Sequence, residues 1–314
     1  MSDNIRLPCG SYLRTDEIDL VHHQRMKVQY GDDGSATDVS AANPLPVTGP
    51  VTDAELRATP LPTAPNNFYV EVSQGNVAGH SVVHKFGANA GVPNGTWELV
   101  TGLSAATKPF PSAATTVRVK AGGNAADTAA GAGAQAITVV GLTSALVEGS
   151  ESIELAGASA SASTTTQFWR IYRAYVTRAG TYATPVNTAN IVLENTAGTL
   201  DLMQVGAGNG QSLHAAWAAP TGYDVYLIGV SLLIDATKAA DLRMYTRENL
   251  NDVTTPFAPA RVKRFWSGIL GAYSDTMTSP MLLLQSPGDI WFEARGGGQV
   301  TSCSVDFDLL LVAQ

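Results

Sequence analysis

Apolar and polar residues alternate along much of the chain, and this pattern predicts β-strands rather than helices. Val300–Val312 is the clearest such run. Its odd positions carry the apolar side chains of Cys303, Val305, Phe307, Leu309 and Leu311. A period of two places alternate side chains on opposite faces of a sheet. We therefore expect a central strand with one buried face at the end of the sequence.

Other runs rich in β-branched and aromatic residues extend this pattern from residue 68 onward. Gln167–Thr177 and Tyr223–Asp235 are long enough to be central strands. Shorter runs are separated by Gly, Asn, Pro and Ser at intervals of roughly 8–12 residues. These shorter runs are Phe68–Ser73, Thr115–Lys120, Ala136–Gly141, Ile191–Glu194 and Leu200–Val205. The spacing predicts an all-β fold, a β-sandwich that is jelly-roll-like. Only Ala236–Asn249 suggests a helix, and its Arg243–Thr246 portion fits a strand equally well.

The first 65 residues have a different pattern and predict an extended N-terminal arm. Met26–Tyr30 alternates like a strand and is followed by the turn sequence Gly31-Asp32-Asp33-Gly34. Asn43–Thr48 contains two prolines, which remove backbone donors and fix an extended path. We expect residues 1–65 to anchor the protein on a neighbour, or to be disordered in the isolated chain. The expected anchoring residues are Met26, Val28, Tyr30, Asn43, Pro44, Leu45, Pro46 and Val47. Residues 66–314 then form the β-sandwich, as one domain or as two subdomains, 66–185 and 186–314.

The charge of the chain limits the classes of partner that it can bind. The net charge of -8 opposes binding to phosphate backbones or anionic lipid, so we expect no nucleic-acid partner. No apolar run approaches the roughly 18 residues of a membrane helix, and the start lacks an apolar signal region. We therefore expect a soluble protein with neither membrane insertion nor a secretory signal. Only 15% of residues are charged, which favours a homo-oligomer, in our interpretation a trimer, whose surface faces partners.

Residues suited to catalysis or metal binding form no recognisable motif. His80 and His84 are four apart, but a third ligand at a suitable spacing is missing. Three glycine clusters lack the Lys and following helix of a phosphate loop, and we interpret them as hairpin tips. They are Gly131-Ala132-Gly133, Gly206-Ala207-Gly208-Asn209-Gly210 and Gly296-Gly297-Gly298. Cys9 and Cys303 are expected to be free thiols. We therefore predict no catalytic, cofactor or metal residue and no enzymatic activity, the alternative being a carboxylate pair of the kind found in glycan-cleaving tailspikes.

The order of several short segments resembles that of virion proteins of tailed bacteriophages. The resemblance begins in the arm, from Val28-Gln29-Tyr30-Gly31-Asp32-Asp33-Gly34 to Asn43-Pro44-Leu45-Pro46-Val47-Thr48. It continues through Gly75–Ser81, Lys85-Phe86-Gly87, Thr96-Trp97-Glu98, Asp127–Ala134, Gly141-Leu142, Glu151, Leu155-Ala156-Gly157, Arg170, Pro220-Thr221-Gly222, Arg247-Glu248, Asp289-Ile290 and Leu309–Val312. These segments are turns and strand starts, so the resemblance implies a structural role and assigns no catalytic residue.

The resemblance implies one of two alternative positions, or stations, for the protein on such a particle. The first is an oligomeric capsid decoration or head-associated protein, assembled in the host cytoplasm and bound to the major capsid or tail proteins through its arm. The second is a tail or baseplate receptor-binding protein. In that case Trp97, Trp217, Tyr223 or Trp266 would stack on host surface glycan. Aromatic residues of sandwiches are more often buried in the core, which favours the first station.

Overall fold

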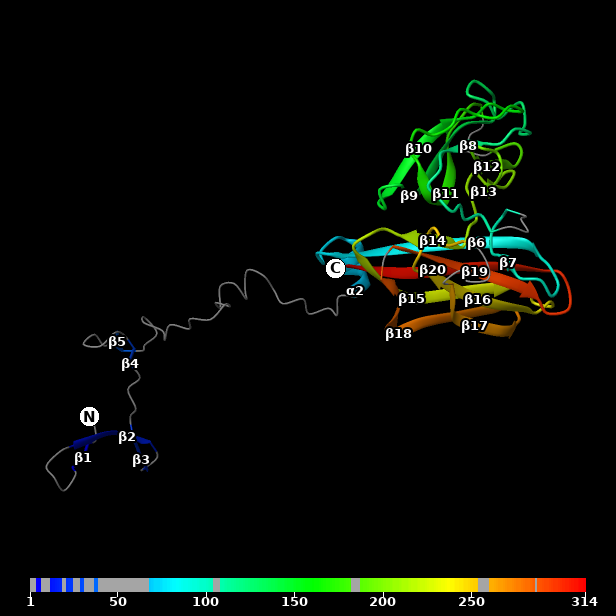
Figure 1. The fold of residues 1–314 in the computed structure, drawn as a ribbon. Coiled ribbons are helices and arrows are strands. Elements are labelled where there is room, and N and C mark those ends of the chain that lie inside the picture. The colour runs from blue at the N-terminus through cyan, green and yellow to red at the C-terminus, as the bar shows by residue number, and fades with distance from the viewer. Residues whose placement is uncertain are drawn as a thin grey trace. The chain divides into compact units, whose positions relative to one another are not determined.

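The computed structural model describes residues 68–103, 108–181, 187–253, 260–285 and 287–314, together with five short strands before residue 67. Contacts divide the chain into two units, Met1–Asn66 and Asn67–Gln314. In the described part strands predominate, and its one helix is α2 (Phe68–Ser73) (Figure 1). The all-β class predicted from the alternating pattern is confirmed.

The N-terminal unit contains two small antiparallel arrangements. In the first, β2 pairs with both β1 and β3. In the second, β4 pairs with β5, so the chain reverses direction between Tyr30 and Thr37, where the turn sequence lies. The strands β1, β2 and β3 therefore form an antiparallel meander. The bounds are β1 (Asn4–Arg6), β2 (Tyr12–Ile18), β3 (Val21–Gln24), β4 (Gln29–Tyr30) and β5 (Thr37–Asp38).

Two antiparallel sheets of the second unit form a β-sandwich. The first sheet has the order β18-β15-β20-β6, and the second has the order β14-β19-β16-β17 with β7 also paired to β19. Figure 1 shows the two sheets stacked beneath the strands drawn in green. The bounds are β6 (His80–Val92), β7 (Glu98–Leu99), β14 (Ala216–Ala219), β15 (Tyr223–Ile234), β16 (Ala240–Arg247), β17 (Arg261–Ile269), β18 (Ala272–Gln285), β19 (Gly288–Gly296) and β20 (Thr301–Ala313).

The inner faces of both sheets meet in one large hydrophobic core. β20 shows the predicted alternation, since the apolar side chains at its odd positions from Cys303 to Leu311 are buried. Phe292 of the opposite sheet packs on Phe307 with ring centroids 4.9 Å apart. Leu242 and Met244 of β16 are also fully buried in this core. The interior is therefore filled by side chains, as alternation in two facing sheets requires.

One edge strand of the second sheet is interrupted. β7 and β14 pair with successive stretches of the same strand, β19, although the sequence between them is long. The Ala215 N–H donates to the Val100 oxygen at 2.9 Å, and the Gly102 N–H donates to the Leu213 oxygen at 2.8 Å. The two halves of the strand therefore meet at the point where the chain leaves the sandwich and returns to it. We call residues 102–213 the inserted lobe.

The inserted lobe has two sheets and a core of its own. Its sheets have the orders β10-β9-β11 and β13-β12-β8. Buried residues of both, such as Ile137 and Leu193, form a second hydrophobic cluster. β8 and β12 pair across residue 185, so the boundary considered at 185/186 passes between strands of one sheet. The bounds are β8 (Val117–Val119), β9 (Ala134–Thr143), β10 (Glu148–Glu154), β11 (Phe168–Ala179), β12 (Ile191–Asn195) and β13 (Asp201–Val205).

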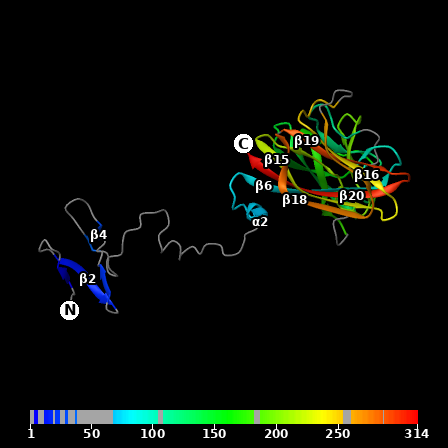
Figure 2. The ribbon, with the colours of Figure 1, turned by 90° about the horizontal axis from the view of Figure 1, so that it is seen from below.

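Phe68–Ser73 was predicted to be a strand and is instead the short helix α2. Its β-branched and aromatic residues favour strands, but the pair Tyr69 and Val72 faces one side of a helix. Both pack on Ile228 and Leu310, on the outer face of the first sheet (Figure 2). Gly75, at φ 78°, ends the helix, and the backbone N–H of Asn76 donates to the backbone carbonyl oxygen of Glu71. Packing on the sheet decides the conformation here, and Phe68 is 46% exposed rather than in the core.

Two local predictions are resolved by the strand pairing. Ala236–Asn249, which fitted a helix or a strand, contains the strand β16, paired on both sides. Gly296-Gly297-Gly298, interpreted as a hairpin tip, connects β19 of one sheet to β20 of the other. That interpretation was wrong, because the glycines carry the chain across the sandwich instead of between paired strands.

Candidate functional site

Most of the predicted anchoring residues lie outside the described part of the chain. Tyr30 is the last residue of β4, where it pairs with Thr37. Met26, Val28 and the segment Asn43–Val47 fall among residues whose placement the structure does not describe. Their role as an anchor stays a prediction.

The described residues contain no cluster of three or more His, Cys, Asp or Glu side chains that could hold a metal ion. His80 and His84 both lie on β6, as expected for a strand. His84 Nδ1 is 2.8 Å from Asp308 Oδ1 on the neighbouring strand. Cys303 is a free thiol inside the sandwich, where burial raises its pKa to about 12. Cys9 lies outside the described residues.

Within the part of the chain that the structure describes, no helix has the length and apolar character needed to cross a bilayer.

A buried ionic network joins the inserted lobe to the sandwich. Arg170 of β11 donates from Nε to Asp289 Oδ1 at 2.8 Å and from Nη2 to Oδ2 at 2.9 Å. Arg247 of β16 donates to the same carboxylate. Both guanidinium groups also lie 5.2 Å from the ring centroid of Phe110. The side chains of Asp289, Arg170 and Arg247 are at most 4% exposed, so this joint is almost free of water.

A second set of polar groups lies at the base of the lobe. His214 Nδ1 is 2.9 Å from Thr101 Oγ1, on the two segments that bridge at the exit of the lobe. Burial, with a smaller contribution from Lys85, lowers the pKa of His214 to about 3. Lys85 of β6 donates from Nζ to the backbone carbonyl oxygen of Tyr172 at 2.8 Å, and burial lowers the pKa of Lys85 to about 8. The imidazole is therefore neutral and enclosed at neutral pH, which suits a structural role.

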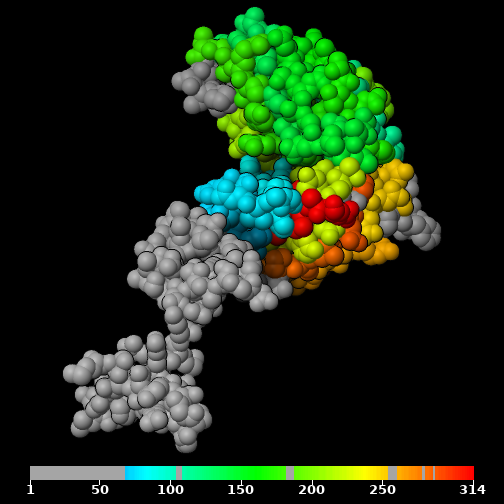
Figure 3. Space-filling model, turned by 90° about the vertical axis from the view of Figure 1, so that its left-hand side faces the viewer, coloured from blue at the N-terminus to red at the C-terminus, as the bar shows by residue number. Residues whose placement is uncertain are grey.

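The approach of β6 to β14 depends on one glycine. A Cβ atom on Gly87 would lie 2.1 Å from the Ala215 nitrogen. No side chain fits there, so Gly87 allows the edges of the two sheets to meet beneath the inserted lobe. In the space-filling view the lobe, in green, stands above this junction as a distinct mass (Figure 3).

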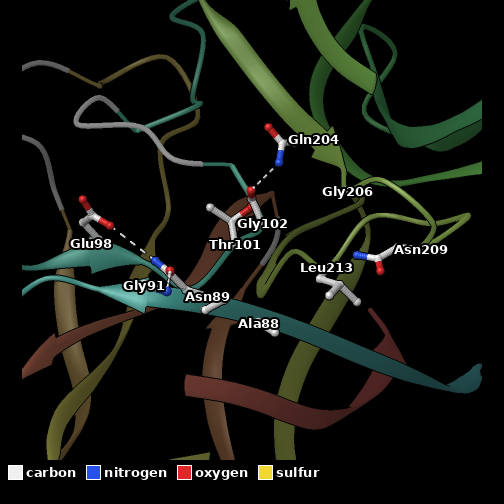
Figure 4. Close-up of a pocket in the computed structure, with 11 residues that line it drawn as sticks. Ala88, Asn89, Gly91, Glu98, Thr101, Gly102, Gln204, Gly206, Asn209 and Leu213 are labelled. Carbon is white, nitrogen blue, oxygen red and sulfur yellow. Dashed lines mark hydrogen bonds between the residues drawn. The ribbon is translucent and has the colours of Figure 1, made fainter. Parts of the chain in front are cut away.

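A cavity of about 380 Å³ opens between the lobe and the sandwich (Figure 4). The sandwich contributes the end of β6 and the interrupted strand, and the lobe contributes the end of β13 and the loop that follows. Its polar side chains are Asn89, Glu98, Thr101, Gln204 and Asn209. The remaining wall consists of Ala88, Ala90, Gly91, Gly102, Gly206 and Leu213. We call this space the junction cavity.

Sequence reasoning missed the junction cavity. Its wall is made of alanines and glycines that bear no motif, and its polar residues come from segments that only the insertion brings together. Gln204 belongs to the predicted strand Leu200–Val205, and the glycines around Asn209 were interpreted as a hairpin tip. No local pattern marks a cavity there.

Of the four aromatic residues proposed for glycan stacking, two are buried and two are half-buried. Trp217 and Trp266 are 3% and 6% exposed and belong to the sandwich core, so they cannot stack on a ligand. Trp97 is half-buried, with the Arg243 guanidinium 4.0 Å from its ring centroid. Tyr223 is half-buried at the start of β15. The assignment of Trp217 and Trp266 to glycan contacts was therefore wrong.

Exposed apolar side chains gather on the side of the sandwich formed by β17 and β18. Val262, Phe265, Leu270 and Leu282 are between 44% and 54% exposed. In the described part of the chain, no strand pairs with the outer edges of β17 and β18. This side therefore offers apolar contacts and unpaired backbone groups to another chain.

Comparison with known proteins gives matches only among solved structures. No protein-family model and no curated protein sequence matches the chain. The structure of infectious bursal disease virus Gx strain matches at 9% identity and a TM-score of 0.22, covering 74% of this chain and 71% of that chain. The VP2 subviral particle of the same virus matches at 10% identity and a TM-score of 0.21, covering 75% and 72%. The structure of the Gt strain of this virus matches at 9% identity and a TM-score of 0.20, covering 79% of this chain and 78% of that chain. At these TM-scores the matches support no conclusion about function.

Proposed function

We propose that this chain is a non-enzymatic structural component of a tailed-phage particle, an oligomeric capsid decoration or head-associated protein held by its N-terminal arm. The observation that carries the proposal is the strand order of the sandwich. If β7 and β14 are counted as one interrupted strand, eight antiparallel strands form two four-stranded sheets with the order of a jelly roll. Viral capsid domains use this fold.

Jelly rolls also occur in lectins and in cupins, so the fold alone does not decide the role. A cupin-type metal site needs ligands and space inside the fold. Here the interior is filled by large apolar side chains, including Trp217, Leu242 and Phe307. The packed interior and the resemblance of the sequence to phage virion proteins both favour a structural role.

The exposed side of β17 and β18 supports oligomer formation. Unpaired strand edges with apolar side chains are unfavourable for an isolated protein, and covering them with a second copy removes that cost. A homotrimer of this chain, with further contacts to the major capsid or tail proteins, is consistent with that surface. The virion is the location that follows, after assembly in the host cytoplasm.

The experiment that tests the proposal is to find the protein on the intact particle. Purified particles are labelled with gold-conjugated antibody against residues 67–314 and imaged, and their protein content is measured by mass spectrometry. We expect label over the capsid at regular positions. Absence of the protein from washed particles would contradict the proposal.

A receptor-binding protein of the tail or baseplate is the second candidate. The observation in its favour is the junction cavity, which is lined by amides and one carboxylate. Mixing the purified protein with emptied capsids and, separately, with host cells distinguishes the two roles. Binding to capsids supports decoration, and binding to host surface glycan supports the receptor-binding role.

A further inference from the structure

The junction cavity has no part in the structural role proposed above, yet it has the size and lining of a ligand site. Its volume of about 380 Å³ falls in the range of small-molecule sites, which often lie where two domains meet. We propose that the junction cavity binds a neutral saccharide. This inference goes beyond the structural role and does not depend on the protein's station on the particle, although it supplies residues for the receptor-binding candidate.

The charges around the cavity exclude most other ligand classes. None of the residues that line it is Lys, Arg or His, and its one ionisable side chain is Glu98. Phosphates, sulfates and acidic sugars would therefore meet a carboxylate without a compensating cation. Leu213 is the one large apolar side chain of the lining, which is too little to hold a lipid or an aromatic ligand.

The polar side chains have hydrogen-bonding capacity to spare. Glu98 accepts one bond, from Asn89 Nδ2 at 3.3 Å. Gln204 donates from Nε2 to the Gly102 oxygen at 2.9 Å, which leaves its carbonyl oxygen to accept (Figure 4). Within the described part of the chain, Asn209 donates from its backbone N–H to the Gly206 oxygen, and its side chain forms no hydrogen bond with the other lining residues (Figure 4). Carboxylate and amide groups together offer acceptors and donors, which is what adjacent sugar hydroxyls require because each hydroxyl can donate and accept.

The small residues of the wall give a sugar ring its space. Gly91 and Gly102 leave room that side chains would otherwise fill, since no atom lies within 3.4 Å of the Cβ position of either glycine. A Cβ on Gly206 would lie 2.7 Å from Asn209 Nδ2, so this glycine permits the amide to lie where it does. The Leu213 side chain offers the one large apolar contact for the C–H face of a ring. The lining thus combines polar groups with small apolar ones, and its volume suits about one or two sugar units.

The test uses the full-length protein and defined sugars. The probes are glucose, galactose, mannose and N-acetylglucosamine, and neutral oligosaccharides built from them, with binding measured by saturation-transfer NMR and calorimetry. We expect at least one neutral sugar to bind saturably. Asn209→Ala and Glu98→Gln should each weaken that binding about tenfold or more, because the first removes an amide partner of the ligand and the second replaces a charged acceptor by a neutral amide. Asn251→Ala, an exposed amide that does not line the cavity, is the matched control and should bind like the wild type.

Three results would overturn the inference. They are the absence of saturable binding by every neutral probe, equal weakening by Asn251→Ala, and unchanged affinity in both cavity variants. The melting temperature of each variant is measured alongside, and Asn209→Ala, on an exposed loop, keeps the test valid if Glu98→Gln unfolds. Gold labelling of particles separates this inference from the proposed function. Labelled particles without sugar binding contradict only the saccharide site, and sugar binding without labelled particles contradicts only the virion role.

Discussion

Single residues at the joint between the lobe and the sandwich carry charges that are costly to bury. Asp289 compensates two guanidinium groups, Arg170 and Arg247, in a site nearly closed to water. Removing one partner of a buried pair leaves an uncompensated charge, whereas an exposed pair contributes little. How much a charged residue contributes to the free energy of unfolding therefore depends on how deeply it is buried, and not on how many ion pairs the protein contains.

We expect Asp289→Asn to lower the free energy of unfolding by about 3–5 kcal/mol, because both arginines would remain buried without a counter-ion. Urea denaturation followed by tryptophan fluorescence measures the change. Asp201→Asn is the control, since Asp201 pairs with Lys120 at the surface, and its effect should stay below about 1 kcal/mol. Equal effects of the two substitutions would contradict the role assigned to the joint.

His214 should give the protein a specific sensitivity to acid. In the folded state burial keeps its pKa at about 3, whereas in the unfolded chain it protonates near its usual 6.5. The unfolded chain therefore binds more protons between these values, and the free energy of unfolding falls as pH drops from 6.5 towards 3. This residue contributes a slope that approaches about 1.4 kcal/mol per pH unit.

The measurement compares the wild type with His214→Gln at a series of pH values, because carboxylates such as Asp241 and Glu293, whose pKa values are lowered, add a slope of the same sign. Above pH 7 the variant is less stable, and the difference should shrink as pH falls. His84→Gln, at an exposed position, serves as the control. A difference that does not change with pH would show that His214 protonates in the folded state as easily as in the unfolded one.

Elements with strong internal patterns could be predicted from the sequence, and elements defined by distant partners could not. β15 and β20 are long, alternate clearly and were predicted within a residue or two. α2 was mistaken for a strand, because Tyr69 and Val72 favour strands until a sheet surface is available for them to cover. β7 has two residues and is completed by β14, so no local pattern indicates that the two continue one edge.

The junction cavity was unpredictable for the same reason. Glu98 and Gln204 become neighbours only because the halves of the interrupted strand meet at Val100 and Ala215. The arrangement of the site is therefore a property of the insertion and not of any segment.

The inserted lobe should be removable as an element. Thr101 and His214 form an antiparallel bridge, so an Asn-Gly turn can replace residues 102–213 between them. We expect the shortened protein to unfold cooperatively, with lower stability because Arg170 and Phe110 are lost from the joint. The isolated lobe, which has its own core, should also unfold cooperatively. Calorimetry measures both, and a fragment without a transition would show that the two cores are interdependent.

On the scale of the whole molecule, the two contact units predict independent behaviour. Residues 67–314 contain all four hydrophobic clusters of the described chain. Deleting residues 1–66 should therefore leave the melting temperature within about 2 °C of the wild type, because the four clusters all remain. The same deletion should abolish binding to emptied capsids if the arm is the anchor.

Co-sedimentation with emptied capsids and light scattering together evaluate this truncation. Undiminished binding to capsids would place the attachment in the main domain. A fall from oligomer to monomer would show that the partner of the arm is a sister subunit. A variant with Pro44 and Pro46 replaced by alanine tests whether the proline-containing segment itself makes the contact.

The interrupted strand also constrains the order in which the protein folds. Val100 and Ala215 form a hydrogen bond, but the long loop between them must close first, and closing an unstructured loop of that length costs entropy. Prior folding of the inserted lobe shortens this loop to a few residues. The lobe should therefore fold before the sandwich, and Leu193→Ala, which weakens the core of the lobe alone, should slow refolding detected at Trp217 in the sandwich. Folding of the inserted lobe would then limit the rate at which the sandwich folds, although the lobe has a separate core.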